Sequence, residues 1–396
     1  MFKNLKVNNE EKTNIILEVN RLISKAVERG CSDIHIEPFE NSVRVRFRID
    51  GRLYEEETLE PFIYQRYISR IKVMSGLNIA EKRLPQDGSF NFKKDDFNVD
   101  IRVSTISTIY GEKLVLRILE KDLAKIKLEN LGILSRDLKL LLKLSKVENG
   151  LIYLTGPTGC GKTTTLYSLL QQLNDKRVNI ITIEDPVEFK ISGINQIQIN
   201  EKAGITFSSA LRSILRQDPE IILVGETRDR ETAQISVRAS ITGHKVFSTL
   251  HTNDSYSAII RLLDMGVEDY LIRASLRGVV SQRLIRNLCP HCKVEMPISQ
   301  KQIDYLKNLG IEDFPEVVYG PCGCSHCHEG YLGRKALLEI LIIDKDFRKL
   351  IKEDVNLDDL KTLGRKKSIE SLEYKGALDF VSGNTSFEEL ANLSII

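Results

Sequence analysis

The sequence has no apolar segment long enough to cross a membrane, and its first residues lack the apolar core of a signal peptide. It also has almost no excess of charge: the formal net charge is +2, so nothing favours electrostatic capture of nucleic acid by the whole chain. Internal repeats, low-complexity segments and long flexible linkers are absent as well. These absences predict a cytoplasmic protein, which can still dock on a membrane protein.

The composition is typical of a soluble globular protein, with 42% hydrophobic and 28% charged residues. A length of 396 residues is sufficient for two or three domains with cores of their own. Four of the seven cysteines form two C-x-x-C pairs. In a reducing compartment, this spacing indicates metal binding rather than disulfides.

Residues 156–163 form a complete phosphate-binding motif, G-x-x-x-x-G-K-[ST]. An apolar run at 151–154 precedes it and a helical stretch at 163–173 follows, as the motif requires. The backbone N–H groups of such a loop bind phosphate oxygens at a helix N-terminus. Lys162 is expected to reach the β- and γ-phosphates, and the Thr163 hydroxyl to bind Mg²⁺. The motif predicts binding of a nucleoside triphosphate by Gly156, Pro157, Thr158, Gly159, Cys160, Gly161, Lys162, Thr163 and Thr164.

The pattern of apolar residues changes along the chain. Helices are predicted at 10–29 and 64–74, a strand at 43–49 before a hairpin turn at 50–51, and further strands at 89–92, 99–103 and 113–118. Near-continuous apolar strands then follow at 151–155, 178–184, 221–225 and 246–250, which is typical of a buried parallel sheet. Three more helices are predicted near the end, at 344–352, 358–366 and 387–393.

These patterns predict an α/β protein with five segments. We expect an α+β domain at 1–125, a connector and leading helix at 126–146, and a P-loop α/β core at 147–285. A small tetracysteine subdomain at 286–333 and a helical C-terminal region at 334–396 complete the expected organisation.

Acidic residues follow two of the predicted parallel strands. Glu226 comes directly after the strand at 221–225, while Glu184, Asp185 and Glu188 close or follow the strand at 178–184. Ligands of α/β sheets bind at the carboxyl ends of the strands, so both groups are expected to face the phosphates. There a carboxylate can orient the attacking water or share Mg²⁺. The alternative for each acid is a helix cap or an ordinary surface position.

Two histidines flank the strand at 246–250. His251 leaves its carboxyl end, where a sensor of the γ-phosphate is expected, and His244 precedes the strand after a glycine. Both are candidates for the nucleotide site, although a lone histidine is more often structural. Arginines that can stabilise a transferring phosphoryl group are also present in the first domain. The residues leave six candidates open: Arg44, Arg46, Arg48, Arg83, Arg102 and Arg117.

The paired cysteines have the spacing of a tetrahedral Cys₄ zinc site, formed by Cys289, Cys292, Cys324 and Cys327. The segment between the pairs, 293–323, is longer than in a usual zinc ribbon, so the site is expected to span a small insert. Four thiolates leave no open position on the metal, which indicates a structural site. Four reduced thiols without metal are the alternative, and the other nearby candidate ligands are Cys322, His291, His326 and His328.

From about residue 12 onward, the chain resembles the ATPases of type II secretion and type IV pilus assembly. The similar blocks are SDIHIEP at 32–38, the R-x-R-x-D-G hairpin, RLPQDG at 83–88, the P-loop, an acidic box at 184–188, GETRD at 225–229, a histidine box at 242–251, and both cysteine pairs. The resemblance implies a PAS-like first domain and a RecA-like ATPase core, arranged as a homo-hexameric ring with ATP between the domains.

The resemblance also implies roles for individual residues. It selects Arg102 and Arg117 as arginine fingers, Glu188 for activation of water and Glu226 for the metal shell. Hydrolysis is expected to move one domain against the other and to act on a polytopic inner-membrane platform protein that adds pilin subunits to a fibre. The chain is therefore expected at the inner membrane through its partners, without nucleic acid.

Three departures from the family pattern affect these expectations. The extra N-terminal domain that docks many relatives on an adaptor is expected to be missing. Cys160 stands where serine is usual, and its alkylation is expected to block ATPase activity unless nucleotide is bound. Cys322 is a further candidate near the zinc ligands.

The cysteine pairs also favour one branch of the superfamily. Retraction motors and conjugation-type ATPases normally lack these pairs, so the chain is expected in the extension or secretion branch. Two other functions stay open: a nucleotide-gated scaffold with negligible turnover, and a RecA-like translocase of nucleic acid.

Overall fold

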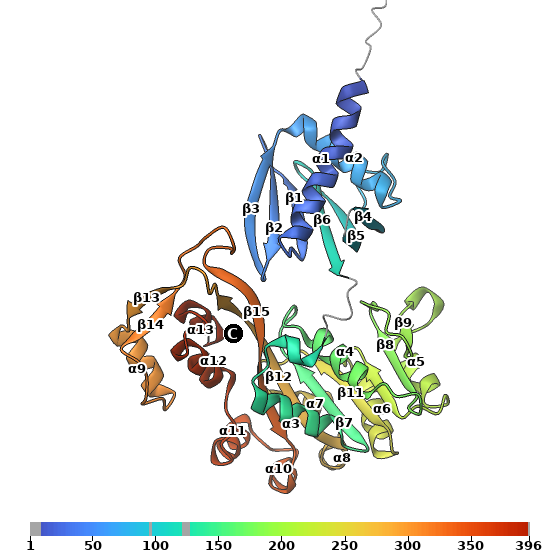
Figure 1. Ribbon diagram of the computed structural model, residues 1–396. Helices are drawn as coiled ribbons and strands as arrows, with labels where there is room; N and C mark the ends of the chain where they lie inside the picture. Colours follow the sequence, from blue (N-terminus) through green and yellow to red (C-terminus); the bar gives the residue numbers. More distant parts are fainter. Residues whose placement is uncertain (1–8, 95–96, 121–126, 395–396) are drawn as a thin grey trace, which may run out of the picture. The chain divides into compact units, whose positions relative to one another are not determined.

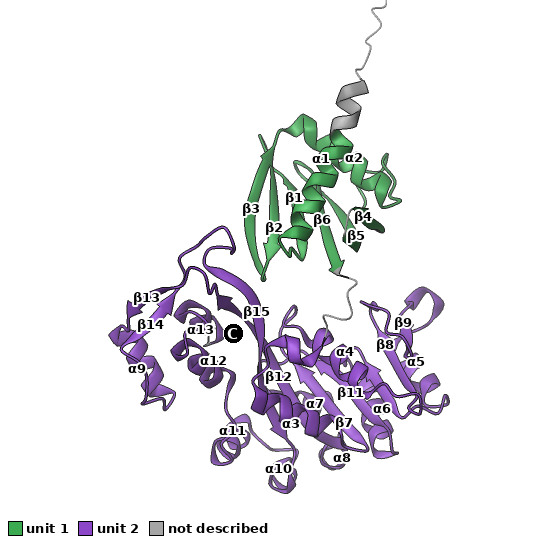
Figure 2. Ribbon diagram, in the orientation of Figure 1, with its two compact units in different colours: residues 1–122 green, residues 123–396 purple. Residues whose placement is uncertain are grey.

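The computed structural model describes residues 9–94, 97–120 and 127–394, which belong to two compact units, residues 1–122 and 123–396 (Figures 1 and 2). The boundary expected at residues 125–126 lies outside the described residues. Among the described residues, no helix is both long and apolar enough to span a bilayer. Each unit is built on its own sheet.

Unit 1 has a six-stranded antiparallel sheet in the order β3-β2-β1-β6-β5-β4, together with two helices. Its elements are α1 (Asn9–Glu28), β1 (Asp33–Pro38), β2 (Val43–Ile49), β3 (Arg52–Leu59), α2 (Pro61–Met74), β4 (Gln86–Lys94), β5 (Phe97–Thr108) and β6 (Gly111–Glu120).

The alternation in β2 determines which face of this sheet is buried. Val43, Val45 and Phe47 are buried and pack in one core with residues of α1 and α2, such as Ile23 and Ile71. The two helices therefore cover this face, and the arginines of β2 lie on the other one. The strand predicted at 43–49 is confirmed.

The opposite face of the unit 1 sheet carries acidic residues that form ion pairs with arginine and lysine side chains. Glu37 of β1 accepts hydrogen bonds from Arg46 at 2.8 and 2.9 Å and forms an ion pair with Lys113 at 2.8 Å. Burial alone would raise the pKa of Glu37, but these contacts outweigh it and lower the pKa to about 2. Asp33 binds Arg117 in the same way, with 2.9 Å between Oδ1 and Nε.

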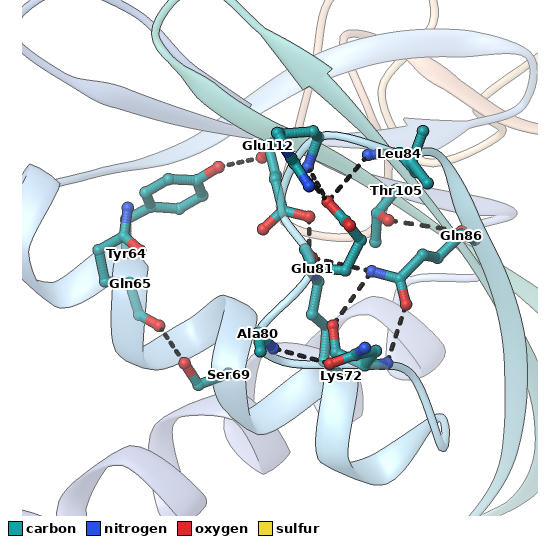
Figure 3. Close-up of polar contacts among 12 residues, drawn as sticks. Tyr64, Gln65, Ser69, Lys72, Ala80, Glu81, Leu84, Gln86, Thr105 and Glu112 are labelled. Carbon is teal, nitrogen blue, oxygen red and sulfur yellow. Dashed lines mark hydrogen bonds and ion pairs between the residues drawn. The ribbon is translucent and has the colours of Figure 1, made fainter.

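A buried ion pair fastens the segment before β4 to this unit, as Figure 3 shows. Lys72 of α2 is 0% exposed, and its Nζ lies 2.5 Å from Oε1 of the buried Glu112 at the start of β6. The same Nζ donates a hydrogen bond of 2.7 Å to the carbonyl of Glu81. The hydroxyl of Tyr64 donates to the backbone carbonyl of Glu112. Lys72 thus joins α2, β6 and the segment 77–86.

The segment 77–86 is closed by its own side chains (Figure 3). Gln86 Oε1 accepts from the Asn78 N–H at 2.8 Å, and Gln86 Nε2 donates to the carbonyls of Asn78 and Glu81. Glu81 Oε1 accepts from the backbone N–H of Arg83 at 2.7 Å. The exposed Arg83 therefore sits on a loop that is held at both ends.

Unit 2 contains a seven-stranded sheet in the order β15-β12-β7-β11-β10-β8-β9, which is parallel except for β15 at one edge. The elements of this sheet and its covering helices are η2 (Leu128–Leu131), α3 (Ser135–Ser145), β7 (Gly150–Thr155), α4 (Lys162–Leu173), β8 (Ile180–Glu184), β9 (Asn195–Gln198), η3 (Glu201–Ala203), α5 (Phe207–Ile214), β10 (Ile221–Val224), α6 (Arg230–Ile241), β11 (Lys245–Leu250), α7 (Ser257–Asp264), α8 (Asp269–Ser275), β12 (Leu276–Leu288) and β15 (Tyr331–Ile342).

Helices cover both faces of the sheet. On one face, Ile152 and Leu154 of β7 pack with residues of α3 and α4, among them Leu141 and Leu170. On the other face, alternate strand residues such as Tyr153 pack with α5, α6, α7 and α8. The mixed α/β architecture expected from the buried apolar strands is confirmed.

The region between β12 and β15 is an insert, and four helices follow β15. The insert contains β13 (Val294–Pro297), α9 (Gln300–Asn308) and β14 (Val317–Gly320), and the last helices are α10 (Lys345–Leu350), α11 (Leu357–Lys366), α12 (Leu372–Val381) and α13 (Phe387–Ser394). Both boundaries expected around the insert, at 285–286 and 333–334, fall inside strands of the main sheet. The segment 334–396 therefore begins with a strand, which the sequence patterns did not predict, before its helices.

Replacement of Lys72 by alanine should destabilise unit 1, because Glu112 would remain buried without its partner. We expect a loss of about 3–5 kcal/mol in the free energy of unfolding. The measurement is hydrogen exchange of β1 and β6 amides in the full-length chain. Arg21→Ala, which removes an exposed partner 3.6 Å from Glu57, is the control and should cost less than about 1 kcal/mol. Equal losses in both variants would contradict this assignment.

Candidate nucleotide site and cysteine cluster

The loop between β7 and α4 has the backbone that its glycines permit. Gly156, Gly159 and Gly161 have φ values of 141°, 79° and 85°, which residues with a Cβ rarely adopt. A Cβ atom at Gly156 would also lie 2.5 Å from the carbonyl oxygen of Gln282. Gly161 is the N-cap of α4, and the exposed Thr163 lies in the first helical turn. The loop therefore ends at a helix N-terminus, where an anion is stabilised.

Lys162 lies inside this loop. Its Nζ donates hydrogen bonds to the carbonyls of Gly156 at 2.8 Å and Pro157 at 2.9 Å. Burial lowers the pKa of Lys162, and the nearby Arg283 lowers it further, whereas Glu226 and Cys160 oppose the shift. The ammonium group is thus held where the loop backbone curves, at the position from which a lysine of this motif reaches phosphates.

Glu226 and His251 come to the same edge because the strands before them are aligned with β7. Leu250 of β11 is opposite Thr155 of β7, and Val224 of β10 is opposite Ser248 of β11. Glu226 Oε2 lies 3.9 Å from His251 Nε2, and Glu226 Oε1 lies 2.5 Å from Arg228. Desolvation lowers the pKa of His251, and the charge of Lys162 lowers it further.

Buried hydroxyl groups fix the backbone that carries Glu226. Thr249 Oγ1 donates to the carbonyl of Gly225 at 2.7 Å, and the Thr227 N–H donates to the carbonyl of Thr249 at 3.0 Å. The hydroxyl groups of Thr227 and Ser248 are 2.8 Å apart. Glu226 is therefore bracketed by two residues that are bonded to β11, which limits its movement relative to that strand.

The acids after β8 differ in their environments. Glu184 is 4% exposed and accepts hydrogen bonds from the hydroxyl groups of Tyr167 and Thr182 and from Gln196 Nε2. Its carboxylate thus joins β8 to α4 and β9, and the contact with nucleotide expected for Glu184 stays a prediction. Asp185 is exposed and Glu188 is partly exposed, in the loop after β8 at the carboxyl edge of the sheet.

His244 lies at the other edge of the sheet. It precedes Lys245, which is opposite Gly150 at the start of β7, whereas the P-loop follows the end of β7. The start and the end of β7 are separated by six strand residues, which corresponds to about 20 Å. His244 Nδ1 lies 2.9 Å from the carbonyl of Ala239. The expectation that His244 binds nucleotide is therefore wrong, and its position indicates a structural role.

Two residues of β12 that the motifs did not reveal contact the phosphate-side loops. Gln282 Nε2 donates to the Cys160 carbonyl at 2.8 Å, and Arg283 Nη2 donates to the Asn253 carbonyl at 2.8 Å. Both side chains are buried. The sequence feature that could have identified them is a polar triplet, 281–283, within an otherwise apolar strand.

The two selected arginines of unit 1 lie side by side. Arg102 of β5 is directly opposite Arg117 of β6, and the Arg117 side chain is 60% exposed. Like charges at opposite strand positions repel each other, and Asp33 offsets part of this repulsion through Arg117. The pair is therefore suited to binding an anion. Of the other candidates, Arg44, Arg46 and Arg48 form ion pairs with Glu37 or Asp33.

The structure brings four cysteine sulfurs together at the base of the insert. All four Sγ atoms lie within 4.8 Å of one another, and measured pairs are 3.9, 3.6 and 3.7 Å apart. Sulfurs bound to one tetrahedral zinc at 2.3 Å would be about 3.8 Å apart. Backbone N–H groups of 323, 324 and 326 point at these sulfurs. The group, which does not include the exposed Cys322, consists of Cys289, Cys292, Cys324 and Cys327.

Comparison with known families gives one match that spans nearly the whole chain. Residues 8–392 match the family described as type II/IV secretion system protein.

Two of the named relatives illustrate the similarity. The chain is 44% identical over 391 residues to the putative type II secretion system protein E of Escherichia coli K12, covering 98% of this chain and 78% of that protein. It is also 44% identical over 378 residues to the type IV pilus assembly ATPase TfpB of Acinetobacter baylyi, covering 95% of this chain and 65% of that protein.

A solved structure has the same fold. The crystal structure of the pilus retraction motor PilT with bound ADP is 26% identical and has a TM-score of 0.63. The match covers 94% of this chain and 96% of that one.

The position of Cys160 changes the expected result of thiol alkylation. Cys160 is 4% exposed, and burial raises the pKa of its thiol, so little thiolate is available to react. We expect Cys160 to react with a maleimide roughly tenfold or more slowly than the exposed Cys322. Peptide-level mass spectrometry after timed labelling measures both rates. Equal rates would show that the loop opens in solution.

Proposed function

The chain belongs to the type II/IV secretion system protein family, and we propose that this ATPase works as a hexameric motor that drives assembly of a pilus or pseudopilus. Its relatives are named as ATPases and proteins of type II secretion and type IV pilus assembly. The hexamer, and a polytopic inner-membrane platform protein as the object of its force, belong to the proposal. Such a motor would associate peripherally with the inner membrane through its partners.

One observation carries the enzymatic part of the proposal. A glycine-rich loop at a helix N-terminus holds Lys162, while Glu226 and His251 end neighbouring strands at the same edge. This arrangement combines donors for phosphate oxygens, an acid and a group that can sense the terminal phosphate. ATP hydrolysis requires these functions at one place.

We assign the individual roles on this basis. The N–H groups of the P-loop and the Lys162 ammonium bind the β- and γ-phosphates of ATP. Thr163 and Glu226 would hold Mg²⁺, which supplies charge neutralisation for these phosphates. Glu188 accepts a proton from the attacking water, and His251 contacts the γ-phosphate. Burial and the charge of Lys162 lower the pKa of His251, which favours the neutral imidazole, a group that can donate or accept a hydrogen bond without adding charge.

Arg102 and Arg117 are proposed to stabilise the negative charge of the transferring phosphoryl group. Their direct opposition across β5 and β6 concentrates two positive charges on one surface. An anion bound there would relieve the repulsion between the two arginines. A phosphoryl group that gains negative charge during transfer is such an anion.

The cysteine cluster is proposed to hold a structural zinc ion. The sulfur spacing fits a single tetrahedral metal, and four thiolates leave no position for substrate. The N–H groups directed at the sulfurs favour the thiolate form. The metal would join the two ends of the insert.

Lys162→Ala should lower the rate of phosphate release by roughly 100- to 1,000-fold, because a donor to the transition-state charge is lost. The measurement is steady-state phosphate release by the full-length chain. Lys146→Ala, at an exposed position before β7, is the matched control and should retain the wild-type rate. Equal, negligible rates in wild type and Lys162→Ala would favour a nucleotide-gated scaffold. Strong stimulation by single-stranded DNA would favour a translocase.

Purified protein should contain about one zinc ion per chain, and Cys289→Ser should abolish this content. Elemental analysis after gel filtration gives the stoichiometry. Cys322→Ser is the matched control, because this cysteine lies outside the cluster, and it should retain the metal. A folded wild-type protein without zinc would contradict the assignment.

A further inference from the structure

Gln282 lies directly beneath the P-loop. It is located on β12, 1% exposed, one residue after Ser281, which is opposite Thr155 at the end of β7. Its Nε2 donates a hydrogen bond of 2.8 Å to the backbone carbonyl of Cys160, and its Oε1 accepts one of 2.8 Å from the Thr165 hydroxyl. One carboxamide therefore bonds the loop before α4 and the first turn of α4 itself.

These two contacts fix the orientation of the carboxamide. A carbonyl can only accept a hydrogen bond, so the Cys160 carbonyl requires the Nε2 side of Gln282. The Thr165 hydroxyl then faces Oε1 and donates to it. Rotation of the amide by 180° would place two oxygens against each other. The arrangement is thus specific for glutamine, and a carboxylate of the same shape does not satisfy it.

The contact with Cys160 also determines the direction of the next N–H group. In a planar trans peptide, the carbonyl of one residue and the N–H of the following residue point in opposite directions. Because the Cys160 carbonyl points to Gln282, the Gly161 N–H points away from Gln282. That N–H is one of the donors by which such a loop binds phosphate.

We propose that Gln282 is a positioning residue for nucleotide binding: it orients the Cys160–Gly161 peptide so that the Gly161 N–H is directed at the β-phosphate. This inference rests on the proposed nucleotide site and adds to it a residue outside the phosphate-binding motif. Close packing at two glycines supports the role. A Cβ atom at Gly161 would lie 2.9 Å from Gln282 Nε2, and one at Gly156 would lie 2.5 Å from the Gln282 carbonyl oxygen.

The neighbouring residue in β12 provides a control that leaves the P-loop contact intact. Ser281 Oγ donates to the carbonyl of Asn253, in the loop after β11, at 3.4 Å. Ser281 is as deeply buried as Gln282. Ser281→Ala therefore perturbs the same strand without removing the bond to Cys160.

The test is the dissociation constant for a fluorescent ADP, measured with the full-length chain in the presence of Mg²⁺. Gln282→Glu places an oxygen against the Cys160 carbonyl and should raise this constant about tenfold or more. Gln282→Leu removes both bonds and should act similarly. Thr165→Val, which alters the link from the helix side, should raise it about threefold. In the double variant Gln282→Leu/Thr165→Val, the Thr165 change should add nothing, because its partner is already gone.

The kinetic pattern separates positioning from a general loss of structure. The β-phosphate contact is present in both the ground state and the transition state, so KM for ATP should rise while kcat changes by less than about threefold. Thermal unfolding of each variant checks that unit 2 remains folded, and Thr165→Val tests the link even if the Gln282 variants do not fold.

Three results would overturn the inference. The first is wild-type ADP affinity in both Gln282→Glu and Thr165→Val, with each variant folded. The second is a loss of ADP affinity in the control Ser281→Ala that equals the loss in the Gln282 variants. The third is a lower kcat in the Gln282 variants with unchanged ADP affinity. Each of these leaves the proposed function standing. Absence of ADP binding by the wild-type chain would instead remove the proposed function itself.

Discussion

The parallel alignment of β7 with its two neighbours, β11 and β12, brings the P-loop, His251 and Gln282 to one edge of the sheet. Thr155 at the end of β7 is level with Leu250 of β11 and with Ser281 of β12. The residues that follow β7 and β11 therefore emerge at one edge, and the β12 triplet 281–283 lies directly beside them. A shift of one residue in either pairing would turn every side chain of the strand to the opposite face. The formation of the site thus depends on strand register as well as on the individual side chains.

Phosphate binding at the carboxyl edge of the sheet could be predicted from sequence, because the P-loop motif is recognised together with the strand before it and the helix after it. The glycines at 156, 159 and 161 are required by positive φ values, and an apolar strand and a helix flank them. Glu226 and His251 were expected at the same edge because each follows an apolar run, and parallel strands share their carboxyl ends. The four cysteines were expected together because paired spacing closes over one metal, and the structure brings them within 4.8 Å.

Other features depend on contacts that sequence patterns do not contain. His244 was a candidate because it flanks the same strand as His251, but the pairing of Lys245 with Gly150 places it at the edge of the sheet away from the P-loop. Glu184 occupies a position suited to catalysis, yet three neighbouring donors use its carboxylate. Gln282 is separated by more than a hundred residues from the loop that it contacts. Likewise, β15 joins the sheet as an antiparallel edge strand, which the run of helices after it concealed.

The continuity of β12 has a mechanical consequence. Gln282 and Cys289 are seven residues apart on an extended path, which corresponds to about 23 Å. Pairing with β15 runs along most of this path, so the distance between the P-loop and the cysteine cluster can scarcely change by stretching. The ladder is irregular between Arg286 and Leu288, and the buried Arg286 is bonded there to Glu389 of the last helix. Bending of β12 should therefore concentrate at this irregularity, where it would change the angle between the strand beside the P-loop and the cysteine cluster.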